Sequence, residues 1–216
     1  MLGRFLELSL HAPSILESIE FWERLGFRQA TTNDIWSHPY AVLSDGTLTI
    51  GLHAYEFESP SLTFVRPDLA QHLPALRAVG VDFEFAKTAD DAFHEAGFLT
   101  PDGQMVALLE SRTFSPPLTG DDDGGSLLGG FGALRLPVRR VDRTLPFFAK
   151  LGMAVIEYDE DAPTTALLAM GSMRLLLDED ARTPVLEFVG ADAQGLERLF
   201  GEVPDASPEG LKLRCG

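Results

Sequence analysis

Glu7 and His53 are the two side chains whose types and positions best suit acid–base chemistry. Residues 5–11 alternate between apolar and polar, which places Glu7 on the side opposite Leu6 and two further leucines. Residues 47–54 alternate in the same way and place His53 on their polar side. A carboxylate beside an imidazole can serve as a general base, or the two groups can simply satisfy each other's hydrogen bonds. The pattern predicts that both face one cavity and leaves the choice open.

The other histidines offer one further arrangement. By strand alternation His11 shares the face of Glu7 and His53, so these three residues are a conceivable metal site, although His11 stands at the end of its strand. Three more histidines are expected to face solvent, the first in a loop and the others in helices: His38, His72 and His94.

Composition limits the class of protein. With 216 residues and 45% hydrophobic content the chain can form one large or two small domains. It has no apolar run of about 18 residues or more, so a soluble cytoplasmic protein without a membrane partner is expected. The net charge of -16 argues against nucleic acid and favours a cationic or neutral ligand. The single Cys215 excludes an internal disulfide and a thiolate zinc site.

The elements that must position Glu7 and His53 recur along the chain. Residues 14–27 form an amphipathic helix that Gly26 ends, with Ser14 and Glu17 as a capping box. Residues 144–153 repeat this helix, and residues 76–81 echo its end. Asp68 is expected to cap the helix that ends at 76–81. Because one strand precedes and extended segments follow each copy, the chain is expected to contain about four such units, the last abbreviated.

These units suggest two domains and a linker. The first domain spans residues 1–115, with units at 4–56 and 60–112, and the second, degenerate domain spans 133–216. Proline, glycine and an aspartate run mark residues 116–132 as the linker. The run at 121–123 lacks the alternating ligands of a calcium loop, so we expect a solvated segment there.

The order of the elements resembles the vicinal oxygen chelate superfamily, which includes glyoxalase I, bleomycin-resistance proteins and extradiol dioxygenases. The motifs are the helix end at 21–27, Phe-Trp-Glu-Arg-Leu-Gly-Phe, and the turn at 101–104, Pro-Asp-Gly-Gln. The resemblance covers residues 4–112 well, 133–178 less well and the remainder weakly. It implies an α+β fold in which paired βαβββ units form curled mixed sheets, with helices outside and a ligand inside the cup.

The resemblance also implies where a metal would bind. In metal-dependent members the ligands lie on the first and last strands of each unit. The corresponding residues here are Glu7, Ser61, Ala133 and Val185 on first strands, and Gly51, Ala107 and Leu176 on last strands. Since only Glu7 can coordinate, and one carboxylate does not hold a divalent ion, no metal and no cofactor are expected.

A cup without metal would be lined by small polar side chains. The expected ligand-binding residues are Glu7, Ser9, Trp36, Thr49, His53, Thr63 and Met105. Trp36 or Tyr40 would lie at the rim and cover a cation, or would serve in packing. In the second half Arg135 and Arg174 face the cup and either bind an anion or, as we expect, pair with Glu157 or Asp178.

Three functions remain open from the sequence. The leading prediction is a metal-free protein of the glyoxalase and bleomycin-resistance type that binds a cationic or neutral small molecule in the N-terminal cup. The alternative is a lyase, isomerase or dioxygenase of the same superfamily that uses a relocated metal or the Glu7 and His53 acid–base pair. A decayed member acting through protein contacts is the third. The expected oligomeric state is a monomer with a fused-dimer arrangement, or a homodimer.

Overall fold

The computed structural model describes residues 1–31, 37–110 and 125–216. The first two units are complete. Unit one comprises β1 (Arg4–His11), α1 (Ile15–Arg24), β2 (Arg28–Ala30), β3 (Tyr40–Ser44) and β4 (Thr49–His53). Unit two comprises β5 (Ser61–Arg66), α2 (Leu69–Ala78), β6 (Phe83–Lys87), β7 (Glu95–Leu99) and β8 (Met105–Glu110).

The second half repeats the unit and then shortens it. Unit three comprises β9 (Gly130–Pro137), α3 (Val141–Lys150), β10 (Ala154–Tyr158), β11 (Thr165–Met170) and β12 (Met173–Asp178). Unit four retains β13 (Val185–Val189), α4 (Ala193–Phe200) and β14 (Lys212–Cys215). The predicted α+β fold of βαβββ units with an abbreviated fourth copy is therefore confirmed.

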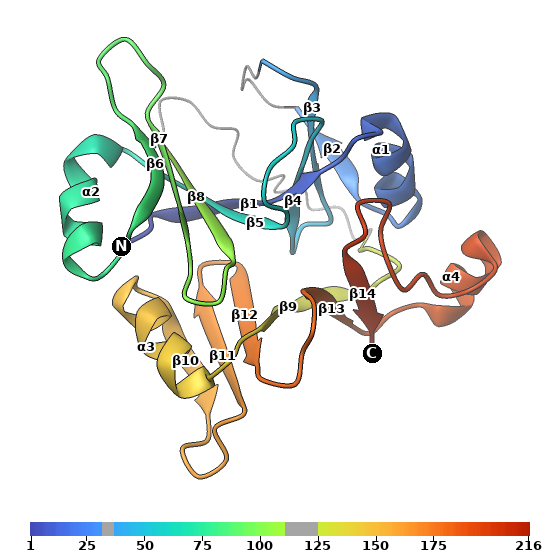
Figure 1. Cartoon of the computed structure of the whole chain (residues 1–216). Coiled ribbons are helices and arrows are strands. Elements are labelled where there is room, and N and C mark those ends of the chain that lie inside the picture. The colour runs from blue at the N-terminus through green and yellow to red at the C-terminus, as the bar shows by residue number, and fades with distance from the viewer. Residues whose placement is uncertain (32–36, 111–124) are drawn as a thin grey trace.

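The units pair one with two and three with four, a question that the sequence left open. The first sheet has the strand order β2-β3-β4-β1-β5-β8-β7-β6 and the second β10-β11-β12-β9-β13-β14. In the first sheet β1 and β5 are antiparallel at the centre, and each lies parallel to the last strand of its own unit. Figure 1 shows the two sheets with α1 and α2 at opposite ends of the first.

One apolar core joins the sheets to their helices. Trp22 of α1 and Leu25, the residue that follows α1, are fully buried in this core, because they lie about one helical turn apart on one face. The prediction that Leu6 faces this core is wrong: Leu6 is half-buried, and Phe5 joins the core and packs edge-on against Phe64. The cause is a bulge between Phe5 and Glu7 that resets the alternation of β1.

Two helix starts also differ from expectation. Ser14 makes no side-chain capping hydrogen bond, and neither does Asp68, which adopts a left-handed conformation with φ 59° and receives a hydrogen bond from Arg66. His94 lies in a loop before β7 rather than in a helix. β9 starts at Gly130, within the segment expected to be linker.

The two halves touch at several points. Phe98 of β7 packs against Phe147 of α3 at a ring separation of 6.2 Å. Asp102, in the turn after β7, accepts hydrogen bonds from the Arg139 backbone at 2.9 Å and from the Thr144 hydroxyl at the start of α3. Among the described helices none has the length and apolar character to span a membrane.

Candidate ligand-binding site

Glu7 is the centre of a hydrogen-bond network on the concave face, which we define as the side of the first sheet turned away from α1 and α2. Its side chain is 1% exposed. Glu7 Oε1 accepts from Ser9 Oγ and from His53 Nε2, each at 2.9 Å, and Oε2 accepts from the Tyr40 hydroxyl at 2.6 Å. Three neighbouring strands, β1, β3 and β4, thus supply groups that hold one buried carboxylate.

Gly51 makes room for that carboxylate. A Cβ atom at position 51 would lie 2.1 Å from Glu7 Oε1 and 2.4 Å from Oε2. The carboxylate therefore lies directly over the backbone of β4, in the space that the side chain of any larger residue at position 51 would occupy. The glycine and the acid form a matched pair across adjacent strands.

The directions of the hydrogen bonds follow from the carboxylate. A carboxylate only accepts, so the Ser9 hydroxyl must donate to Glu7. Ser9 Oγ also lies 2.7 Å from Thr63 Oγ1, and since the Ser9 proton is already directed to Glu7, Thr63 is the donor in that pair. The order is Thr63 to Ser9 to Glu7.

His53 connects Glu7 to a second histidine. Its Nε2–H donates to Glu7. Its Nδ1 lies 3.0 Å from His38 Nε2 and therefore accepts a hydrogen bond from the His38 Nε2–H. Burial, and then the neighbouring His53, lower the pKa of His38 below its usual value. The arrangement is an acid–imidazole–imidazole chain with a neutral outer member favoured near pH 7.

The position of His38 contradicts the expectation of a solvent-facing loop residue. It is half-buried, and its ring stacks on Tyr55 at a centroid distance of 5.5 Å. Spacing along a strand could not have found this contact, because His38 reaches His53 from a bend before β3.

The segment between β4 and β5 borders the network. Phe57 packs edge-on against His53 at 5.6 Å, and the Ser59 hydroxyl accepts from the His11 backbone at 3.0 Å. His11 turns its ring toward Phe57, at 6.4 Å, so it takes no part in the Glu7 and His53 pairing.

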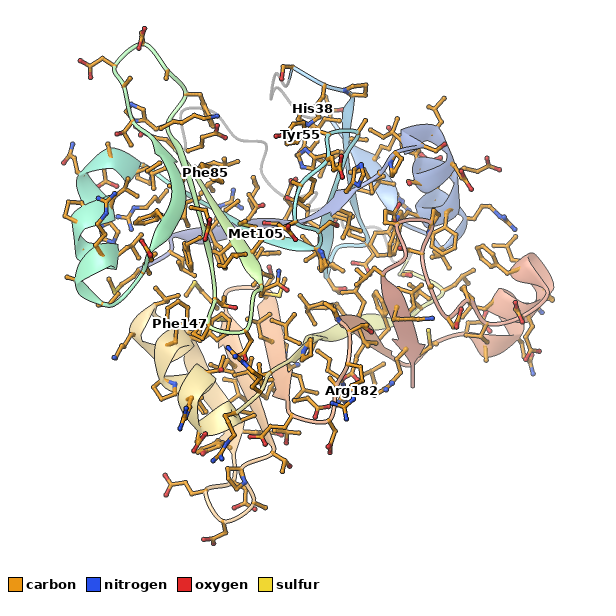
Figure 2. The ribbon with its side chains drawn as sticks, in the orientation of Figure 1. His38, Tyr55, Phe85, Met105, Phe147 and Arg182 are labelled. Atoms are coloured by element: carbon orange, nitrogen blue, oxygen red, sulfur yellow. The ribbon has the colours of Figure 1, made fainter. Side chains whose placement is uncertain are left out.

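Unit two gives the concave face an apolar side. Phe85 of β6 is 38% exposed and lies across Gly97 of β7, while Met105 of β8 is half-buried. Figure 2 shows His38 and Tyr55 toward the unit-one end of the first sheet, Phe85 toward the unit-two end, and Met105 between them. One face therefore combines a polar half from unit one with an apolar half from unit two.

The remaining predicted site residues fall as follows. Ser9 and Thr63 are buried in the network, and Thr49 is half-buried on the same face of β4, two residues before Gly51. Met105 pairs in register with Ser61. Trp36 lies outside the described residues.

Comparison with known proteins supports the architecture. No model of a protein family matches the chain, and no curated protein matches its sequence. The crystal structure of a catechol 2,3-dioxygenase matches with a TM-score of 0.61 and 15% identity over 98% of this chain and 91% of that chain. Homoprotocatechuate 2,3-dioxygenase from Arthrobacter globiformis matches with a TM-score of 0.67 and 12% identity over 98% of this chain and 78% of that chain.

A mutant of homoprotocatechuate 2,3-dioxygenase from Brevibacterium fuscum matches with a TM-score of 0.67 and 13% identity over 98% of this chain and 70% of that chain. The chain has the vicinal oxygen chelate fold. Identities this low establish a shared fold alone, so the chemistry of this chain must be argued from its own residues.

The residues present do not fit the metal that this fold carries in its metal-dependent members. At the expected ligand positions of the first sheet, Gly51 and Ala107 have no coordinating atom, and the carboxylate of Glu7 is already bound by three donors. Within residues 1–31, 37–110 and 125–216 no group of three or more His, Cys, Asp or Glu side chains is arranged to hold a metal ion. The relocated cluster of Glu7, His11 and His53 is not formed.

The second sheet carries an ion-pair network instead. Arg135 of β9 bonds to Asp178 and, at 2.7 Å, to Glu187, which also accepts from Arg214 at 3.0 Å. Burial opposes the charge of Arg135, but hydrogen bonds to Glu187 and Asp178 raise its pKa. Burial likewise opposes the charge of Asp178, whose pKa is nevertheless lowered by the Asp180 backbone N–H and by Arg135. The predicted pairing of Arg135 with Asp178 is confirmed.

Proposed function

We propose that this protein binds a small organic molecule on the concave face of its first sheet without a metal ion. The observation that carries the proposal is the buried Glu7 carboxylate, held by Ser9, Tyr40 and His53 over Gly51. A preorganised polar group facing an apolar wall is typical of small-molecule sites.

The residues of the network differ in burial, and therefore in how they would contact a ligand. Glu7, Ser9, His53 and Thr63 are buried, whereas Tyr40, Thr49 and Met105 are half-buried on the same face. The half-buried residues would meet the ligand first. Glu7 and His53 would fix the orientation of Tyr40 and His38, and would contact a ligand that enters deeply.

The charge of the protein and its fold similarity limit the chemical class of the ligand. The net charge of -16 and the central carboxylate favour a neutral or cationic molecule. Homoprotocatechuate 2,3-dioxygenase from Brevibacterium fuscum is described in complex with 3,4-dihydroxyphenylacetate. This supports an aromatic body for the ligand here, whereas an anionic group would be repelled by Glu7.

The test is a binding screen with a matched variant. Neutral and cationic aromatic compounds would be titrated calorimetrically into wild type, Tyr40→Phe and Tyr158→Phe, the last a tyrosine of the second sheet. Tyr40→Phe removes one donor to Glu7 and should weaken binding about tenfold, whereas Tyr158→Phe should have no effect. Equal affinities in all three proteins would contradict a site on the concave face.

A proton-transfer enzyme, such as an isomerase or lyase, is a second candidate, because the Glu7–His53–His38 chain is suited to it. In such a chain a neutral His38 accepts a proton, and its Nε2–H passes to His53 Nδ1 while Glu7 stabilises the resulting imidazolium. A compound identified in the screen would be incubated in D2O, and exchange at its acidic C–H followed by NMR. We expect His53→Gln to slow exchange by about 10²–10⁴. Exchange no faster than in buffer would exclude this activity for that compound and leave the binding function.

A further inference from the structure

Ser61 stands out on the concave face because its hydroxyl is buried and unbonded. It begins β5, is 2% exposed, and within the described part of the chain its Oγ has no hydrogen-bond partner. Its strand register places it opposite Ser9 of β1 and beside Met105 of β8, at the border between the polar and apolar halves of the face. A buried hydroxyl without a partner is uncommon in native proteins, since it loses its bonds to water and gains none.

The neighbouring hydroxyls show what Ser61 lacks. The protons of Ser9 and Tyr40 are directed to Glu7, and that of Thr63 to Ser9. Ser61 alone of these four has a proton that the described residues do not accept. The hydrogen bonds around Glu7 are therefore made without Ser61, whose hydroxyl is left to bond to a group that the described residues do not supply.

The groups near Ser61 are rich in acceptors. Thr63 Oγ1 and Ser61 Oγ each retain lone pairs, and Glu7 Oε2, which accepts from the Tyr40 hydroxyl, has a second lone pair. An anionic head group would meet a carboxylate, whereas an O–H or N–H group would find acceptors and could also accept from Ser61 if it is a hydroxyl.

We propose that Ser61 Oγ anchors the polar head of the ligand, and that this head is a hydroxyl, which accepts the Ser61 proton and donates to a neighbouring acceptor, carried on an apolar body that packs against Met105. The inference rests on the proposed binding function and deepens it by naming the anchor and the head group. It separates a phenol from an arylalkylamine, an aryl carboxylate and an aryl ether.

The experiment uses four probes of similar size: phenol, benzylamine, anisole and benzoate. Binding to the full-length protein is followed through the ¹³C-methyl resonance of Met105, assigned with Met105→Leu, and affinities are compared with those of Ser61→Ala. The matched control is Ser207→Ala, because Ser207, in the segment before β14, is also a buried serine whose Oγ has no partner among the described residues.

We expect phenol to bind wild type and Ser207→Ala equally, to bind Ser61→Ala about tenfold more weakly, and to bind better than anisole and benzoate. Benzylamine, whose ammonium group cannot accept from Ser61, should lose less affinity in that variant. The urea midpoint of unliganded Ser61→Ala should be no lower than that of wild type, since no hydrogen bond to a described residue is lost. Unchanged affinity in Ser61→Ala, or preferred binding of anisole or benzoate, would refute the role of Ser61 while leaving the binding function intact. If no probe shifts the Met105 resonance of wild type, both proposals fail.

Discussion

Replacing Gly51 with alanine tests whether the buried carboxylate is held as the structure indicates. The new Cβ would lie 2.1 Å from Glu7 Oε1, whereas ordinary contact starts at 3.4 Å, so the carboxylate must retreat by about 1.3 Å (3.4 − 2.1). Bonds of 2.9 Å to Ser9 and His53 and of 2.6 Å to Tyr40 do not survive that displacement.

The magnitude follows from the groups involved. A hydrogen bond to a charged group contributes about 1.5–3 kcal/mol, and the displaced carboxylate recovers part of the sum by turning toward water. Alanine in place of a strand glycine would by itself stabilise by about 0.5–1 kcal/mol. We therefore expect the free energy of unfolding to fall by about 3 kcal/mol, which corresponds to a urea midpoint lower by about 1–1.5 M.

Gly97 provides the control, because its steric situation is nearly the same and its neighbour is different. A Cβ there would lie 2.3 Å from Phe85 Cε1, but Phe85 is 38% exposed and its ring can swing into solvent. Gly97→Ala should cost less than about 1 kcal/mol. In a Glu7→Ala background Gly51→Ala should become nearly neutral, a coupling of about 2–3 kcal/mol. Equal losses for both glycines, or no coupling to Glu7, would refute the reasoning.

Three further predictions concern charge. Protein purified without chelator should carry no stoichiometric divalent ion by elemental mass spectrometry, and one tight ion per chain that is lost in Glu7→Ala would contradict this. Because burial lowers the pKa of both His38 and His72 from 6.5, the folded state favours their neutral forms, and stability present above that pH should decline as pH falls below it. Urea midpoints at about pH 7.5 and about pH 5.5 should show this, with a smaller difference in His38→Gln; the same difference in that variant would rule His38 out. Arg135→Met should raise the pKa of Asp178 and lower the free energy of unfolding by about 2–3 kcal/mol in urea titrations, and an unchanged midpoint would show that the pair contributes nothing.

The architecture could be predicted because it is repeated. Several copies of one pattern give independent evidence for each element, and the order of strand, helix and three strands is present in the first three units, with a single strand after the helix in the fourth. The placement of Glu7 and His53 on one face also followed from alternation alone. Unit pairing did not, since strand neighbours depend on contacts far apart in sequence.

The incorrect predictions arose where one backbone angle or one contact determines which way a side chain points. A bulge after Phe5 reverses the alternation of β1, and apolar residues at both positions 5 and 6 conceal it. Ser14 has the residue type of a cap, but its φ of -110° and ψ of 80° do not direct its hydroxyl to the helix. His38 reaches His53 through a bend before β3, which residue type does not encode.

The abbreviated fourth unit has kept the parts that pack against α1 of the first half. Phe200 of α4 packs against Phe21 at 5.7 Å, Arg24 donates to the Leu199 carbonyl at 2.7 Å, and Glu209 accepts from Trp22 at 3.3 Å. What it has lost are outer strands that would have widened a second cup. The second half therefore supports the first through α1, so a substitution at the α1 and α4 contact should disturb the first sheet although it is made in the shortened unit.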